Sequence, residues 1–379
     1  MTGSKNRFGA ELRRSIDLQP VLVPVLAIVC AFAVGAIAIL AIGDNPVEAY
    51  WALLRGMFGS GDRIAASLGR STPFIGASLA VAFAFRAGLF NIGAEGQLLV
   101  GATAAAWIGT WASVRDLPGI VAIVVLLVAG AGAGFAYGAV PGLLKAKTGA
   151  HEVIVTIMLN SIALLYVRWL VNSQDPVILR DANSSVPRTA PIEDAARLPT
   201  LVESQPPLHL GFFVMVALAI IVWFVLQRTS FGFEVRTVGT NPEAARYAGM
   251  DVGRTIFLAM AIAGLLAGIA GAGEISGTSG FLSPGVFINI GFDSIAIALL
   301  ARANSFAIVP ASILWGSMLS GAGLMQQEVG LSIDVVRIVQ ALVLLFVAAD
   351  VIVRTVFRIR KASDDPLATS TLASGWGGQ

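Results

Sequence analysis

Residues 91–97 read Asn91-Ile92-Gly93-Ala94-Glu95-Gly96-Gln97, and an apolar run without any charge follows directly and extends to Trp111. This stretch places a carboxylate and two amides at the beginning of a segment long enough to be a membrane helix. A charge is costly in hydrocarbon, so an acid at this position indicates surroundings of protein or water rather than lipid.

A second string of the same kind occurs in the other half of the chain. Residues 289–294 read Asn289-Ile290-Gly291-Phe292-Asp293-Ser294, so that Asn-Ile-Gly, one further residue and an acid occur twice. Two copies, each opening an apolar segment, indicate a duplicated transporter core. The alternative is that both strings are ordinary turns that begin a helix, in which Asn caps the helix and Gly allows close packing.

The composition is that of a membrane protein. Of the 379 residues, 56% are hydrophobic and 13% are charged, and the mean hydropathy is +0.81. Ordinary soluble domains carry about 25% charged residues. The net charge of +2 gives no argument for a nucleic-acid partner. The single Cys30 excludes an intrachain disulfide, and His151 and His209 are too isolated to indicate a metal site.

Ten segments approach the ~20 apolar residues that a bilayer requires. We therefore expect an all-α polytopic membrane protein with about ten transmembrane helices. The expected spans are 21–42, 70–87, 89–111, 119–145, 152–171, 211–227, 255–273, 287–302, 306–324 and 334–354.

These spans form two membrane halves of five helices each, at 21–171 and 211–354. An N-terminal segment at 1–20 precedes them and a tail at 355–379 follows. The connection at 172–210 is rich in Pro, Asp and Ser and lacks apolar periodicity, so we expect an irregular extracytoplasmic loop. This loop either contacts a binding protein or is a solvated linker.

The distribution of Lys and Arg among the loops indicates the orientation of the chain in the membrane. An even number of spans puts both termini on one side of the membrane. With both termini in the cytoplasm, 16 of the 25 Lys and Arg residues fall inside, 7 fall outside and two lie near outer helix ends. The positive-inside rule favours this arrangement.

The two strings occupy matching places in the two halves. Each opens the third span of its half, and the two spans enter the membrane from opposite sides, which defines an inverted-topology repeat of five helices. Strings that break their helices inside the membrane would present helix ends and free backbone groups to a cavity, which suits a polar solute. At the membrane surface they would only be caps.

A further set of polar residues opens the fifth span. Glu152, Thr156 and Asn160 are spaced i, i+4 and i+8, so they share one helix face. That face either lines a translocation path or makes hydrogen bonds between helices. With the two strings, the candidate substrate path comprises Asn91, Glu95, Gln97, Glu152, Thr156, Asn160, Asn289 and Asp293.

A cytoplasmic loop at 228–254 joins the sixth and seventh spans. It contains Gly239-Thr240-Asn241-Pro242-Glu243-Ala244-Ala245-Arg246-Tyr247-Ala248-Gly249. Thr240 or Asn241 can cap a helix whose first turn holds Pro242, and Gly249 can end it. We expect a helix of about two turns, which either docks in a groove of another protein or simply links two spans.

With these two motifs the chain resembles the membrane permeases of ATP-binding-cassette (ABC) importers, in the group for branched-chain amino acids, simple sugars and nucleosides. Residues 90–97 look like the signature of the general nucleoside branch. Residues 239–249 look like the coupling helix that fits the ATPase subunit. The resemblance covers about residues 20–355 and implies a type II ABC importer permease in a bacterial plasma membrane.

The resemblance also implies partners. The chain has no phosphate-binding loop of the form G-x-x-x-x-G-K-[ST], so it is expected to hold no cofactor, and ATP and Mg would be bound by an ABC ATPase subunit. A second, related permease would complete a heterodimer, and an extracytoplasmic binding lipoprotein would deliver the substrate. Purine or pyrimidine nucleosides lead as substrates, followed by ribose-like sugars and then branched-chain amino acids.

Two other classes of protein remain as alternatives. Glu95, Glu152 and Asp293 could supply acid–base groups for an intramembrane enzyme, although no His–carboxylate cluster, metal-ligand spacing or Ser/Lys dyad accompanies them. The same carboxylates could carry protons or sodium in an ion-coupled secondary transporter. The loop at 228–254 argues against that second alternative.

Overall fold

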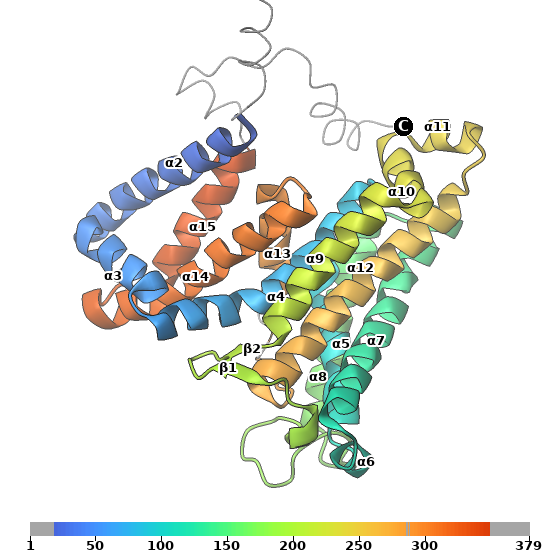
Figure 1. Cartoon of the computed structure of the whole chain (residues 1–379), viewed down its shortest axis with the longest axis horizontal. Helices are drawn as coiled ribbons and strands as arrows, with labels where there is room; N and C mark the ends of the chain where they lie inside the picture. Colours follow the sequence, from blue (N-terminus) through green and yellow to red (C-terminus); the bar gives the residue numbers. More distant parts are fainter. Residues whose placement is uncertain (1–18, 286, 288, 349–379) are drawn as a thin grey trace, which may run out of the picture.

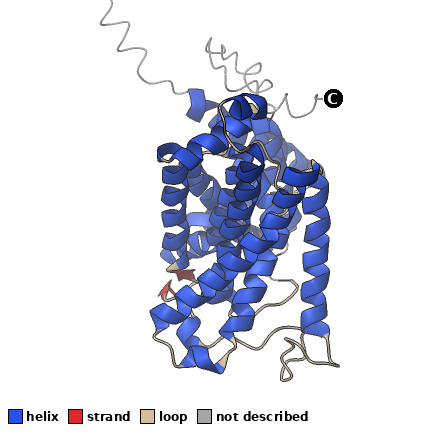
Figure 2. Ribbon diagram, turned by 90° about the vertical axis from the view of Figure 1, so that its right-hand side faces the viewer, coloured by secondary structure: helices blue, strands red, loops and turns tan. Residues whose placement is uncertain are grey.

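The computed structural model describes residues 19–285, 287 and 289–348, and these are almost entirely helical (Figures 1 and 2). The long helices are α2 (Gln19–Ile42), α4 (Gly61–Arg86), α7 (Gly119–Thr148), α8 (Glu152–Asn172), α9 (Gly211–Arg228), α12 (Val252–Glu274) and α14 (Ser305–Val329). The shorter helices are α3 (Pro46–Phe58), α5 (Ala94–Gly109), α6 (Ala112–Arg115), α10 (Ser230–Thr240), α11 (Pro242–Tyr247), α13 (Ile290–Leu300) and α15 (Ile333–Ala348). A 3₁₀ turn, η1 (Asp194–Ala196), a π-helix, η2 (Ile275–Ser279), and an antiparallel hairpin of β1 (Thr200–Val202) and β2 (Leu208–His209) complete the described part.

The expectation of an all-α polytopic membrane protein is confirmed. Seven helices are long and apolar enough to cross a membrane: α2, α4, α7, α8, α9, α14, and α12 with η2. Each of the ten expected spans contains a helix. Those in the third, eighth and tenth spans, α5, α13 and α15, have 16, 11 and 16 residues in the described part. The tail expected at 355–379, the last six residues of the tenth span, and residues 1–18 of the N-terminal segment expected at 1–20 lie outside the described residues.

Two expected boundaries were wrong. The second span was expected at 70–87, but α4 begins at Gly61 and follows a further helix, α3. Charged residues such as Arg55 and Arg63 lower the hydropathy of this region, and the helices form through their caps instead. Asn45 accepts a hydrogen bond from the backbone N of Val47 (3.0 Å), with Pro46 at the first helical position. The third span was expected from residue 89, but residues 89–93 form a turn before α5.

Helix α4 is the centre of the molecule, with 18 of its 26 residues buried. It contacts α9 and α12 on one side and α13 and α14 on the other. In Figure 1, helices α2, α3, α14 and α15 lie together on the left, and α5, α7, α8, α9 and α12 lie together on the right. We call the end that carries α11 the α11 end, and the opposite end, with β1 and β2, the hairpin end.

Helices α7 and α12 touch backbone to backbone along a column of glycines. A Cβ added at Gly134 would lie 2.2 Å from the carbonyl oxygen of Gly264, and one added at Gly268 would lie 2.1 Å from that of Gly130. Small residues allow this approach, which a bilayer favours because packing rather than the hydrophobic effect drives helix association there. The two helix backbones are therefore in direct contact at these glycines.

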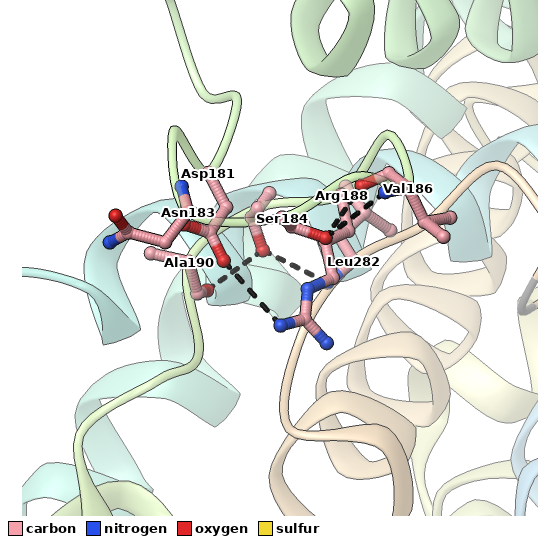
Figure 3. Close-up of polar contacts among 8 residues, drawn as sticks. Asp181, Asn183, Ser184, Val186, Arg188, Ala190 and Leu282 are labelled. Atoms are coloured by element: carbon pink, nitrogen blue, oxygen red, sulfur yellow. Dashed lines mark hydrogen bonds and ion pairs between the residues drawn. The ribbon is translucent and has the colours of Figure 1, made fainter.

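The connection at 172–210 is irregular, as expected, but it is bonded to the bundle (Figure 3). Asp181 pairs with Arg188 (3.5 Å), and the Arg188 guanidinium lies 4.7 Å from the ring centroid of Phe281. The backbone N of Thr189 donates to the carbonyl of Leu282 (2.9 Å), and the backbone N of Leu282 donates to Thr189 Oγ1 (3.0 Å). These contacts tie the loop to the segment that leads into α13.

Candidate functional site

The two Asn-Ile-Gly strings meet in space. The carboxylate of Glu95 accepts hydrogen bonds from the backbone N of Asn289 (3.0 Å) and from that of Gly291 (2.5 Å), at the beginning of α13. An acid at a helix N-terminus is stabilised by the unpaired N–H groups and by the helix dipole. Glu95 therefore caps the helix that the second string opens, and we call this meeting point the string junction.

The sequence of the second string suits this contact. A Cβ at Gly291 would lie 2.2 Å from the backbone N of Glu95, so only glycine fits between the two strings. Asn289 has a left-handed backbone with φ of 67°, a conformation that Asn tolerates better than most residues. Both residues are thus required by local geometry.

The string junction lies at the far end of α13 from the α11 end. Helix α13 has 11 residues, which at 1.5 Å each gives about 16 Å. Its other end is at the α11 end, where the Arg86 side chain donates to the carbonyl of Ala303 (3.0 Å). The junction is therefore about one α13 length, roughly 16 Å, from the Arg86–Ala303 contact at the α11 end.

Asn91 and Gln97 brace the first string from within. The Asn91 amide donates to Gln97 Oε1 (3.0 Å), the Gln97 amide donates to Asn91 Oδ1 (3.2 Å), and Asn91 Oδ1 also accepts from the backbone N of Gly93 (2.9 Å). Both side chains are fully buried. Two amides that satisfy each other in this way hold the turn closed, and neither reaches the surface of the chain.

The polar face of α8 packs against the first string. Glu152, Thr156 and Asn160 are all buried, as their spacing predicts. Asn160 accepts from the backbone N of Gly96 (2.8 Å) and donates to the carbonyl of Ile92 (2.9 Å). Thr156 donates to the Glu152 carbonyl of its own helix (2.8 Å).

Glu152 connects the same string to α7. Its carboxylate pairs with Lys145 (2.9 Å) and accepts a long hydrogen bond from the backbone N of Phe90 (3.4 Å). Lys145 was not among the candidate site residues, because a lysine near a helix C-terminus has many ordinary explanations. The described contacts of Glu152 and Asn160 thus join α8 to α7 and to the first string.

Part of the string junction reaches the surface of the chain. Asn289 is exposed, Phe292 is 44% exposed, and Glu95 and Asp293 are half-buried. Polar groups at this depth require protein or water beside them rather than lipid. This surface is where a solute or a partner subunit can contact the two strings.

The helix of about two turns expected in the coupling segment is α11, and a further helix, α10, precedes it. Gly239 and Thr240 end α10, and Asn241 caps α11 by accepting from the backbone N of Ala244 (3.0 Å). Glu243 and Arg246 pair on the α11 surface (2.7 Å). The opposite face is anchored by Ala245, which is buried against Val238 and Val252.

One aromatic residue, Tyr247, stands on the exposed side of this segment. Tyr247, the last residue of α11, is 93% exposed. Gly249 follows with φ of +81° and ends the segment, as its residue type predicts. A rigidly anchored helix with an exposed aromatic side chain is suited to contact with another protein.

A contact that the sequence did not indicate joins this segment to the first string. A Cβ at Gly239 would lie 2.2 Å from the carbonyl oxygen of Arg86 and 2.9 Å from the backbone N of Gly88. Gly88 itself has φ of +72° and belongs to the turn that leads into Phe90 and Asn91. The only sign of this turn in the sequence was Gly88, three residues before the first string.

A second buried polar cluster lies at the hairpin end. His209 Nδ1 accepts from the backbone N of Gly211 (3.2 Å), and its Nε2 lies 3.3 Å from Thr278 Oγ1, which also contacts Glu274 (3.3 Å). A Cβ at Gly277 would collide with the imidazole. Burial lowers the pKa of His209 to about 4, so the imidazole is neutral at physiological pH.

No group of three or more His, Cys, Asp or Glu side chains with metal-binding geometry occurs among residues 19–285, 287 and 289–348. The functional features of the described chain are instead hydrogen-bonded turns, helix ends and one exposed helix.

The family described as "Branched-chain amino acid transport system / permease component" matches residues 63–348. The guanosine ABC transporter permease protein NupP of Bacillus subtilis is 42% identical over 344 residues, which cover 89% of this chain and 96% of that protein. The nucleoside ABC transporter permease protein NupB of Lactococcus lactis is 33% identical, covering 91% and 95% of the two chains. The glucose ABC transporter permease protein TsgB13 of Haloferax volcanii is 34% identical, covering 85% and 86%. No solved structure matches the chain significantly.

Proposed function

The chain belongs to the family of branched-chain amino acid transport system permease components, and from this premise we propose that it is the membrane subunit of an ATP-driven importer that moves nucleosides into the cytoplasm. As a member of this family it is a transport subunit and not an enzyme. The observation that carries the substrate class is the 42% identity to a guanosine permease over nearly the whole of both proteins.

Sugars are the second candidate substrate. The glucose permease is as similar to this chain as the nucleoside permease of Lactococcus lactis is, at 34% against 33% identity. Ribose hydroxyls and glucose hydroxyls need the same kind of hydrogen-bonding groups, so the polar string junction suits both. The higher identity to the guanosine permease favours nucleosides.

We place the α11 end in the cytoplasm, together with both termini. The uneven distribution of Lys and Arg supports this orientation. The α11 helix, with the Glu243–Arg246 pair and exposed Tyr247, would then dock in an ABC ATPase subunit that binds ATP and Mg. At the hairpin end, the bonded loop at 173–210 and the β1–β2 hairpin offer an anchored surface to a binding lipoprotein.

The exposed part of the string junction would face a second, related permease across the substrate path. Asn289, Asp293 and the half-buried Glu95 are polar groups at the depth of hydrocarbon, and a water-filled path between two permeases satisfies them. In this arrangement Glu95 and Asn289 belong to the path. Asn91, Gln97 and Asn160 hold the turns that present them.

Movement would reach the path through one relay of backbone contacts. ATP binding moves α11 and the end of α10, and Gly239 presses on the turn at Arg86 and Gly88. That turn continues into the first string, and Glu95 holds the beginning of α13. The ATPase thereby biases the balance between two conformations because it contacts them differently.

Uptake of radiolabelled guanosine and uridine, in a strain that lacks this chain, tests the substrate class. We expect uptake to be lost, to return with the gene, and to resist an excess of unlabelled glucose, ribose and leucine. Loss of glucose or ribose uptake with normal nucleoside uptake would transfer the proposal to sugars. Continued uptake in vesicles without the ATPase subunit would contradict ATP-driven transport.

A further inference from the structure

The α11 end carries a small basic cavity beside the turn between α13 and α14. Its volume is about 70 Å³, and none of its lining residues is acidic. The lining residues are Arg86, Trp223, Leu226, Gln227, Ala303, Asn304 and Ser305. Helices α4, α9 and α14 all contribute, so the cavity depends on the tertiary fold rather than on one helix end.

One arginine lines this cavity, and two more contact residues of its lining. Arg86 lines it directly and uses its Nε to donate to the Ala303 carbonyl (3.0 Å). Arg236 donates to Gln227 Oε1 (3.3 Å), and the Arg228 guanidinium lies 5.8 Å from the centroid of the Trp223 ring. Within the described ranges none of the three forms an ion pair with a carboxylate, and Arg236 repels Arg86. Such a group of cations without a carboxylate partner attracts an anion.

The turn that forms one wall of the cavity is strained. Arg302 and Ala303 are consecutive non-glycine residues with φ of 50°, in the left-handed region that L-amino acids rarely adopt. This turn aims the Ala303 carbonyl at Arg86 and lets Asn304 cap α14 by accepting from the backbone N of Phe306 (3.0 Å). Strain of this kind persists where a functional site requires it. The exposed side chain of Arg302 adds a fourth cation near the cavity.

The surroundings of the cavity are those of a membrane interface. The Trp223 ring packs on Phe306, with 5.2 Å between ring centroids. Phe306 and the neighbouring Phe224 are about half exposed. Aromatic residues beside arginines at helix ends mark the level of lipid headgroups, and the exposed apolar side chains beneath offer a surface for acyl chains.

We propose that this cavity binds the phosphodiester headgroup of an anionic phospholipid, held by Arg86, Arg228 and Arg236. Basic pockets between membrane helices on the cytoplasmic side are suited to such headgroups. The lipid would belong to the leaflet at the α11 end, which is the cytoplasmic leaflet in the orientation proposed above. The bound headgroup neutralises the arginines next to the Gly239 contact and so stabilises the relay between α10 and the first string.

Native mass spectrometry of the purified full chain, titrated with phosphatidylglycerol or phosphatidylcholine, tests the proposal. We expect phosphatidylglycerol to bind at least tenfold more tightly, on the order of the gain from two or more basic contacts. The double variant Arg228→Gln, Arg236→Gln leaves the Arg86–Ala303 hydrogen bond in place and so avoids a folding defect. It should weaken phosphatidylglycerol binding by about 25-fold, fivefold for each arginine.

Arg254→Gln is the matched control, because Arg254 lies at the same end but lines a separate cavity with Glu234. It should keep the wild-type preference. Equal binding of the two lipids, or an unchanged preference in the double variant, would overturn the proposal. Displacement of the lipid by inorganic phosphate alone would assign the cavity to a soluble anion instead. Loss of the preference once the ATPase subunit is bound would assign it to an acidic residue of that partner.

Discussion

The contact between Gly239 and the turn at Arg86–Gly88 can be tested by a single methyl group. In Gly239→Ala the new Cβ would stand 2.2 Å from the Arg86 carbonyl oxygen, whereas an ordinary contact begins at 3.4 Å. The obstructing atoms belong to the backbone, so no side chain can rotate away. The end of α10 must therefore move away from the turn by about 1.2 Å, the difference between 3.4 and 2.2 Å, through a shift of the backbone.

The size of the effect follows from this displacement. Overpacking a well-packed contact costs about 1–3 kcal/mol, and the better helix propensity of Ala returns about 1 kcal/mol at most. A net bias of about 1–2 kcal/mol between two conformations changes their ratio by about 5-fold to 30-fold. We therefore expect uptake per ATP hydrolysed to fall by about tenfold, with the complex still assembled.

The measurement is parallel uptake and ATP hydrolysis in proteoliposomes that contain the whole importer. Gly253→Ala is the matched control, because Gly253 also lies at the α11 end and an added Cβ there meets its nearest atom at 3.5 Å. Equal uptake per ATP hydrolysed in Gly239→Ala and Gly253→Ala would contradict the proposed relay. Loss of the ATPase subunit on purification would show a failure of assembly instead, which also contradicts the expected result.

Three further perturbations address other parts of the molecule. Glu95→Gln removes the charge from two hydrogen bonds to the start of α13, each charge-assisted bond being worth about 1.5–3 kcal/mol, so uptake should fall strongly while the chain still copurifies with its partners. Gly134→Ala should lower the melting temperature of the chain by several degrees, because the new Cβ meets the Gly264 carbonyl at 2.2 Å, whereas Gly132→Ala, with no atom within 4 Å, should not. His209 has a folded pKa of about 4 against about 6.5 in the unfolded chain, so its contribution to stability is complete above pH 6.5 and decreases as the pH falls toward 4. Between pH 7.5 and 5 the loss should be about 2 kcal/mol, measured by thermal unfolding.

Each of these expectations has a contrary outcome. Wild-type uptake by the Glu95 variant would make its carboxylate dispensable for transport. Equal melting temperatures for the two α7 variants would contradict the close approach of α7 and α12. A variant His209→Gln that keeps the same loss of stability at acid pH would assign that loss to other groups.

The helices were largely predictable because a membrane span appears in the sequence as a continuous run of apolar residues. Ten apolar segments each contain a helix, and the spacing of Glu152, Thr156 and Asn160 correctly placed them on one buried face. Helix α3 was missed because Arg55 and Glu48 lower the apolar content of the segment, while its cap at Asn45 is a weaker signal than hydropathy.

The contacts between distant segments were not predictable in the same way. Similarity between the two strings indicated a repeat, but nothing local states that Glu95 reaches Asn289 and Gly291, which are almost 200 positions away. The approach of Gly88 to Gly239 is equally invisible, because a glycine leaves no periodic pattern. The site is therefore formed by tertiary packing, and a single sequence does not show which distant residues come into contact.

The backbone contact between α7 and α12 has a mechanical consequence. Two helices that already touch cannot close further, and sliding would drive the carbonyls of Gly130 and Gly264 into their neighbours. We expect this pair to act as a stator, a fixed frame against which the importer works. Helix α13 has 11 residues, and the Glu95 carboxylate holds its beginning, so we expect it to be the element that moves against this frame. Each cycle would then displace α11, the end of α10 and the short helix α13, while the α7–α12 pair keeps its arrangement.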